Sequence, residues 1–154
     1  MQYDYFSNVR VPSYTVGRKK YGNSKRIAEL VEKSIPVFHT LLDFHRDIMI
    51  TLKPRRGDIV GLYDPNVDEV EMDFRFKDDF YVMSILAHEL VHAEQYKQGR
   101  LDSEWHQFGY VYKWHDTYTY ITEEGYNSYI PPWEQEAYER QDGLALVVCA
   151  ELGI

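Results

Sequence analysis

Apolar residues recur at helical spacing in three stretches of the chain, and each stretch predicts a helix. The predicted helices are Ile27–His45, capped by Asn23 or Ser24, then Asp79–Gln98, and finally Trp133–Leu152. Pro36 interrupts the first stretch, so we expect a kink or two shorter helices there. The middle stretch is apolar on all sides, and a helix of that kind is buried in the core.

Shorter apolar stretches predict strands. In Glu69–Phe76 apolar residues alternate with charged ones, which is the pattern of a strand with one buried face, and its polar face suggests a place at the sheet edge. The other predicted strands are Asp47–Leu52 and Asp58–Tyr63, with a hairpin of Tyr110–Trp114 and Thr117–Ile121. A loop with Gly125 and Asn127 follows. The expected fold class is α+β, with a small mixed or antiparallel sheet packed on the buried middle helix, between N-terminal and C-terminal helices.

Length and composition limit the protein class. A chain of 154 residues suggests one domain over 1–154, with residues 1–22 as an irregular arm. The net charge of −8 disfavours a nucleic-acid partner. No stretch approaches the ~20 apolar residues of a membrane helix, so we expect no membrane partner. The first residues lack a signal pattern, which makes the cytoplasm the expected location.

Cys149 is the single cysteine, so the chain has neither an internal disulfide nor a thiolate zinc cluster. It lies in an apolar stretch, and we expect it to be buried. The histidines His39 and His45 fall on the first predicted helix, where they are expected to be packing or surface residues. No pattern in the sequence predicts an oligomeric state.

His88, Glu89 and His92 form a His-Glu-x-x-His pattern in the middle predicted helix. Positions i and i+4 lie on one helix face, so the two imidazoles can converge on one metal ion. Glu89 lies beside this pair, where it can take a proton from a metal-bound water. Burying these groups without partners would be costly, and a metal offsets that cost. We predict a metal site, with two structural histidines as the alternative.

A third ligand must come from elsewhere, because a catalytic zinc ion normally has three protein ligands. The candidates are His106, His115, Glu134 and Glu136. The two glutamates lie at the start of the last predicted helix, which would hold a ligand rigidly. Acidic residues there also complement the helix dipole without any metal, so the residues alone leave the choice open.

The segment 88–92, followed by Glu-x-Glu-Ala at 134–137, resembles the gluzincin class of zinc metallopeptidases. It is most similar to the small members of that class in phages and prokaryotes. The resemblance covers roughly residues 58–142 and implies a zincin-like domain that binds Zn²⁺. In that class the third ligand is the glutamate of a Glu-x-x-Ala segment, which matches Glu134, with Glu136 as the fallback.

The sequence also departs from that pattern. Several gluzincins carry an aspartate four residues after the glutamate ligand, bonded to a ligand histidine, whereas Tyr138 stands at this position. Asp142 and Asp73 are candidates for the missing partner of the imidazoles. Gln95, three residues after His92, also recurs in the minimal families.

The resemblance implies a zinc-dependent peptidase with a peptide or protein substrate. Zinc would activate a water molecule, Glu89 would act as general base, and a Tyr or His would stabilise the oxyanion. The candidate oxyanion donors are His106, His115, Tyr118, Tyr120, Tyr126 and Tyr129. If Glu69–Phe76 is an edge strand beside the metal, it would pair with an extended substrate.

Two other functions compete with this prediction. One is a non-catalytic, zinc-stabilised binding or regulatory protein with a metallopeptidase fold. The other is a DNA-associated protease of the SprT-like type, which shares the His-Glu-x-x-His pattern. The acidic balance and the lack of a cysteine-rich zinc ribbon count against the second. Glu89 favours the peptidase over both, since a purely structural metal site needs no general base.

Overall fold

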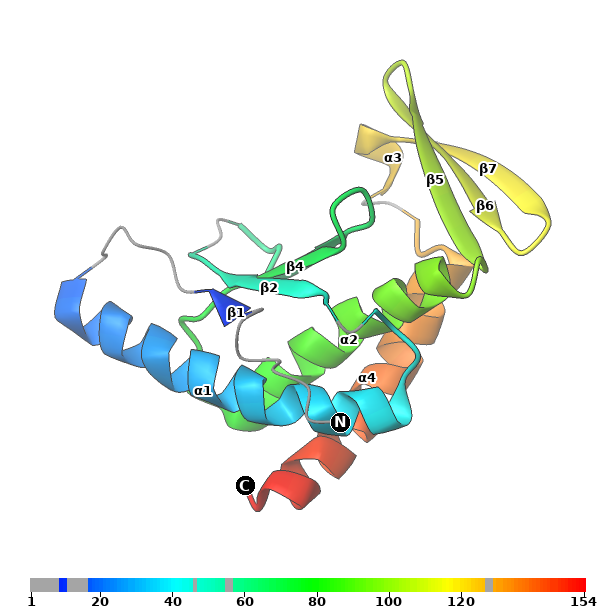
Figure 1. Ribbon diagram of the computed structural model, residues 1–154. Helices are drawn as coiled ribbons and strands as arrows, with labels where there is room; N and C mark the ends of the chain where they lie inside the picture. The colour runs from blue at the N-terminus through cyan, green and yellow to red at the C-terminus, as the bar shows by residue number, and fades with distance from the viewer. Residues whose placement is uncertain (1–8, 11–16, 46, 55–56, 127–128) are drawn as a thin grey trace.

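The computed structural model describes residues 9–10, 17–45, 47–54, 57–126 and 129–154, which adopt an α+β fold with two sheets (Figure 1). In chain order the elements are β1 (Val9–Arg10), α1 (Gly17–Leu41), β2 (Met49–Leu52), β3 (Gly61–Asp64), β4 (Glu69–Met72), α2 (Asp79–Lys97), β5 (Leu101–His106), β6 (Gly109–Trp114), β7 (Thr117–Thr122), α3 (Glu123–Tyr126) and α4 (Pro132–Leu152). Within these residues, no helix is both long and apolar enough to cross a membrane.

The first sheet has the strand order β1-β2-β4-β3, with β3 antiparallel to β4 and the other pairs parallel. The edge position expected for Glu69–Phe76 is therefore wrong, because β4 lies between two strands and β3 forms the edge. The charged residues Glu69 and Glu71 are half-buried, and Glu71 pairs with Lys53. The alternation of charged and apolar residues shows that one face of the strand meets solvent. An inner strand also has such a face when helices cover only one side of the sheet.

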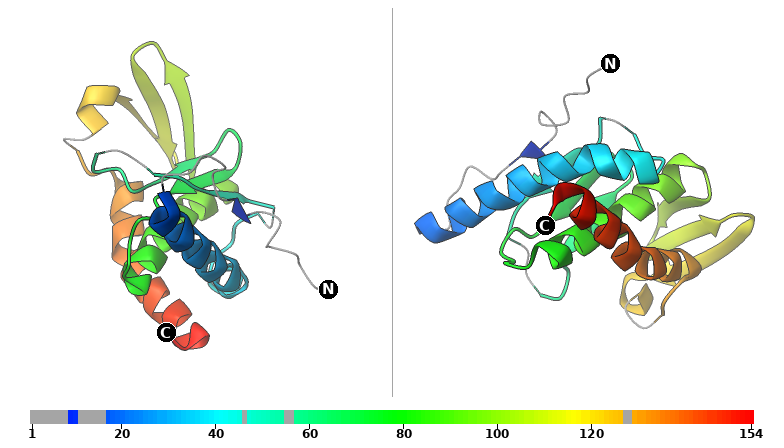
Figure 2. Two further views of the ribbon diagram at one scale, coloured as in Figure 1. Left: turned by 90° about the vertical axis from the view of Figure 1, so that its left-hand side faces the viewer. Right: turned by 90° about the horizontal axis from the view of Figure 1, so that it is seen from below.

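The helices α1, α2 and α4 lie on one side of this sheet, and α2 contacts both β3 and β4 (Figures 1 and 2). The burial expected for the middle helix is confirmed: Leu86, Leu90 and Val91 have no exposed surface. Asp78 caps this helix by accepting a hydrogen bond from the backbone N–H of Phe80. α4 packs along α2, so side chains from two distant parts of the sequence meet between them.

The N-terminal helix begins earlier than the sequence predicts and is not divided at Pro36. It begins at Gly17, so residues 17–22 are helical rather than part of an irregular arm; apart from β1, the rest of 1–22 lies outside the described residues. Arginine and lysine at 18–20 are good helix formers and extend the helix past the predicted caps. α1 is one continuous helix across Pro36, so the alternative of two shorter helices is wrong.

The second sheet is antiparallel, in the order β5-β6-β7, and projects from the C-terminal end of α2 (Figure 1). The predicted hairpin is confirmed as β6 and β7. β5 was not expected, because most of its side chains are exposed and Leu101 alone is buried, so its sequence has no apolar pattern. The loop expected around Gly125 contains a single helical turn, α3.

The minor packing predictions have clear outcomes. Cys149 is buried against the core, as expected. His39 stacks on Phe44 with ring centroids 3.9 Å apart, and His45 is exposed. Both histidines thus have the packing and surface positions that the sequence favours.

Alanine substitutions at Gly109 and Gly143 should have opposite effects on stability. A Cβ on Gly109 would lie 2.5 Å from the carbonyl oxygen of Ile121, in the backbone of the neighbouring strand. Gly109→Ala should therefore lower the free energy of unfolding by about 1–3 kcal/mol. Gly143, in α4, has nothing within 4 Å of such a Cβ, and Gly143→Ala should raise it by about 0.5–1 kcal/mol. Urea unfolding of both variants measures this, and changes of the same sign would contradict the packing described.

Candidate metal centre

His88, His92 and Glu134 come together between α2 and α4. The two Nε2 atoms of the histidines lie 3.2 Å apart. Oε2 of Glu134 lies 3.2 Å from Nε2 of His88, and its Oε1 lies 2.7 Å from Nε2 of His92. A tetrahedral zinc ion with ligands at about 2.0–2.1 Å separates neighbouring ligand atoms by roughly 3.3–3.4 Å. The two Nε2 atoms, and Nε2 of His88 with Oε2 of Glu134, lie close to this spacing, whereas Oε1 of Glu134 lies nearer to His92, at hydrogen-bond distance.

The hydrogen bonds made by the two Nδ1 atoms determine whether each Nε2 atom can donate or accept. Nδ1 of His88 lies 2.9 Å from the amide oxygen of Gln141, and Nδ1 of His92 lies 2.9 Å from that of Gln95. An amide oxygen only accepts, so each Nδ1 carries the proton, and in a neutral ring Nε2 is then an acceptor. Two acceptor nitrogens and a carboxylate thus converge without a donor among them. Such a set requires a cation, either protons or a metal ion.

The pKa values of His92 and Glu134 show how a proton supplies the positive charge when no metal is bound. Burial lowers the pKa of His92, but the hydrogen bond and charge of Glu134 outweigh burial and raise it to about 9. Burial acts to raise the pKa of Glu134, yet its contacts with His88 and His92 hold it well below its usual range. Without a metal, therefore, an imidazolium and a carboxylate share the site. The three side chains are 9–16% exposed, so the site is shielded but open to a small ion.

Glu89 lies between α2 and the edge strand β3. It is 8% exposed, and this burial raises the pKa of its carboxyl group, against the opposing influence of the two histidines. Its carboxylate accepts a backbone hydrogen bond from Tyr63. Gly61 leaves the space that it occupies: a Cβ there would lie 3.1 Å from Oε1 of Glu89. The carboxyl group is thus fixed beside the histidines.

An aromatic cluster fixes the start of α4, where Glu134 lies. Trp133 is 2% exposed and stacks on Tyr112, with ring centroids 4.7 Å apart. Its indole N–H donates to the hydroxyl of Tyr126 at 3.2 Å, and this hydroxyl donates to Oε1 of Glu134 at 3.1 Å. The glutamate is therefore held by a phenol as well as by its helix. Tyr126 is the one candidate oxyanion donor with a hydrogen bond to the three-residue cluster among the described residues.

The other candidate ligands have different partners. Glu136 accepts from Arg100 at 2.7 Å and from Arg140 at 3.1 Å, so it belongs to a network of ion pairs rather than to the cluster. His106 ends β5, and His115 lies in the turn after β6, where its ring contacts Trp114. Neither histidine joins the group formed by the described residues.

The structure also excludes both aspartates considered as partners of the imidazoles. Asp142 accepts a hydrogen bond from Ser84, and Asp73 pairs with Arg75 at 2.6 Å. The amides of Gln141 and Gln95 stand in the place expected for a carboxylate. Gln141 was missed by sequence reasoning, although it lies seven residues after Glu134 and thus on the same face of α4. The Tyr138 ring packs against the His88 ring, with the ring centroids 4.7 Å apart.

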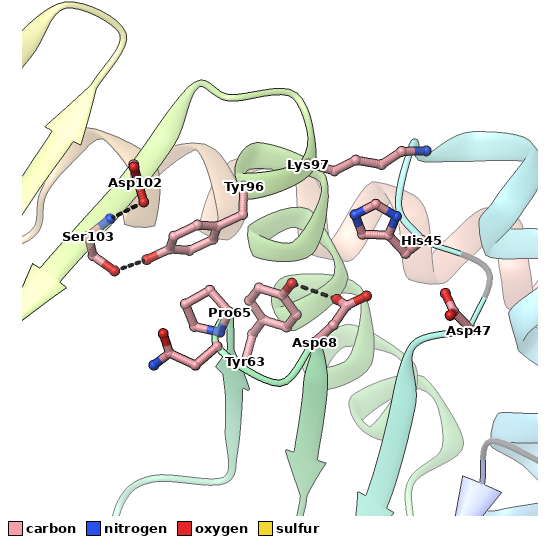
Figure 3. A pocket seen from close by; sticks show the side chains of 10 residues that line it. His45, Asp47, Tyr63, Pro65, Asp68, Tyr96, Lys97, Asp102 and Ser103 are labelled. Carbon is pink, nitrogen blue, oxygen red and sulfur yellow. Dashed lines mark hydrogen bonds between the residues drawn. The ribbon is translucent and has the colours of Figure 1, made fainter.

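A cavity of about 470 Å³ lies at the C-terminal end of α2 (Figure 3). Its lining residues are His45, Asp47, Tyr63, Pro65, Asn66, Asp68, Tyr96, Lys97, Asp102 and Ser103. Tyr63 donates to Asp68 at 2.6 Å, and the hydroxyls of Tyr96 and Ser103 lie 2.7 Å apart. Tyr96 is one helical turn beyond His92, but none of the three residues of the candidate metal centre lines the cavity.

Comparisons of the chain with models of protein families, with curated proteins and with solved structures found no match. The resemblance to gluzincins therefore stays a prediction, and the site has to be interpreted from its own geometry.

Proposed function

We propose that the chain is a zinc-dependent peptidase in which His88, His92 and Glu134 hold the metal and Glu89 is the general base. The observation that carries this proposal is the convergence of three acceptor groups, with a buried carboxyl group beside them. Two imidazoles with one carboxylate are a common ligand set of catalytic zinc. A metal site that only stabilises the fold would not need a general base, and hence would not need Glu89 beside the ligands.

Each residue has a definite part in the proposed reaction. When bound, zinc would supply a Lewis acid that activates a water molecule and polarises the peptide carbonyl. Glu89 would accept the proton that this water loses and pass it to the leaving amine. Tyr126 is the candidate oxyanion donor that lies beside the metal ligands, and its single hydroxyl proton, now donated to Oε1 of Glu134, would turn to the developing oxyanion.

The proposed substrate is an extended peptide or an unfolded segment of a protein. β3 is the edge of the first sheet, and Gly61 on this strand adjoins Glu89. A peptide that pairs with β3 would run past the general base and the metal. This assigns to β3 the role that the sequence favoured for Glu69–Phe76. A cytoplasmic location stays a prediction, as does the absence of a nucleic-acid partner expected from the acidic balance.

Metal analysis and a cleavage assay test the proposal together. We expect about one zinc ion per chain. We also expect cleavage of a mixed peptide library, detected by mass spectrometry. A chelator should abolish cleavage, and added zinc should restore it. A folded chain without affinity for zinc would refute the proposal. Zinc binding without cleavage would instead support the non-catalytic, zinc-stabilised protein.

A further inference from the structure

The amide of Gln95 is held in one orientation by groups that have no role in binding the metal. Its Nε2 donates to the backbone carbonyl of Trp133 at 3.0 Å and to Oε2 of Glu136 at 3.1 Å. Both of these partners only accept, so the amide cannot turn over without placing its oxygen against two other oxygens. Oε1 must therefore face Nδ1 of His92, at 2.9 Å. Gln95 is fully buried, which makes an unsatisfied orientation costly.

Glu136 is itself fixed by two arginines. Arg100 donates to its Oε2 at 2.7 Å and Arg140 to its Oε1 at 3.1 Å. The same arginines lie 3.5 and 2.8 Å from Oε1 of Glu94, a carboxylate that is 6% exposed. Each arginine thus bridges two glutamates, one on α2 and one on α4. The network joins the two helices that carry the candidate metal ligands.

We propose that Gln95 and Glu136 are positioning residues: the fixed amide oxygen of Gln95 holds the Nδ1–H of His92 and so turns the Nε2 atom of this ring toward Glu134, where a metal would take the place of the Nε2 proton. Glu136 acts through Gln95, since it does not touch the imidazole. The importance of this arrangement for metal binding rests on the proposed function. The placement of the proton does not, because it follows from hydrogen bonds within the metal-free chain.

The first test is nuclear magnetic resonance of the metal-free chain labelled with ¹⁵N-histidine. We expect a protected Nδ1–H of His92, which exchanges with water far more slowly than that of an exposed histidine. Gln95→Met keeps a similar volume but removes the acceptor, and the protection should be lost. Gln141→Met is the matched control, because it removes the corresponding acceptor of His88 and should leave the His92 signal unchanged. Absence of the Nδ1 proton in the parent, or unchanged protection in Gln95→Met, would overturn the proposal.

The second test measures the zinc dissociation constant by competition with a chelator. Gln95→Met should raise it by about 10- to 100-fold, as for other groups that orient a ligand histidine. Glu136→Gln should raise it less, and the double variant should bind zinc no more weakly than Gln95→Met alone, because both changes act through one contact. If the two substitutions change the zinc dissociation constant additively, Glu136 acts independently of Gln95, and the proposal that it acts through Gln95 is overturned. If the parent itself fails to bind zinc, the proposed function fails, whereas the protected proton would still support the positioning role.

Discussion

Replacing Glu89 with glutamine should reduce peptide hydrolysis by about 10²- to 10⁴-fold while zinc binding persists. The amide has nearly the volume of the carboxylate, so the space beside Gly61 remains filled. Its oxygen can still accept the backbone hydrogen bond from Tyr63. What the amide cannot do is accept a proton. The variant therefore removes the proposed general base and leaves the metal ligands in place.

The measurement compares turnover of a peptide that the parent cleaves with the zinc content of the same preparations. Glu151→Gln, an exposed change in the last turn of α4, is the control for loss of one negative charge and should keep parental turnover. Equal turnover in Glu89→Gln and the parent would assign the proton transfer to another group. A loss of zinc from Glu89→Gln would place this carboxylate among the ligands instead.

The buried helix and its two histidines are the parts most open to sequence reasoning. The burial of α2 follows from apolar residues on all sides, and the shared face of His88 and His92 follows from the helical repeat alone. The choice of Glu134 over Glu136 came from the resemblance to gluzincins, not from local chemistry. In the structure, the difference between them is the pairing of Glu136 with two arginines, one of which, Arg100, lies 36 residues away in sequence.

Other features could not be predicted because they depend on contacts between distant residues. Strand order is set by which strands pair, and the alternation in β4 reports its exposed face but not its neighbours. β5 has mostly exposed side chains and is a strand because it pairs with β6. Gln141 and Gln95 look like ordinary polar residues in sequence, and their role appears only where each amide oxygen meets an imidazole.

The Glu134→Gln substitution should weaken zinc binding by on the order of 10²- to 10³-fold, about one ligand's share of a typical zinc-site affinity. The change removes the negative charge and places amide N–H donors where the two Nε2 acceptors converge. These donors can satisfy the histidines without a metal. The metal-free variant should therefore keep its fold while zinc no longer stabilises it.

Thermal unfolding without zinc and with zinc at about ten times the dissociation constant of the parent measures this difference, since an ion that binds only the folded chain stabilises it by RT ln(1 + [Zn]/Kd). We expect a clear rise for the parent and almost none for Glu134→Gln. Glu139→Gln removes the same charge from an exposed position on the same helix and should retain the rise. Equal stabilisation of the Glu134→Gln variant and the parent would mean that another group completes the ligand set, and His88 and His92 would then need a different third partner.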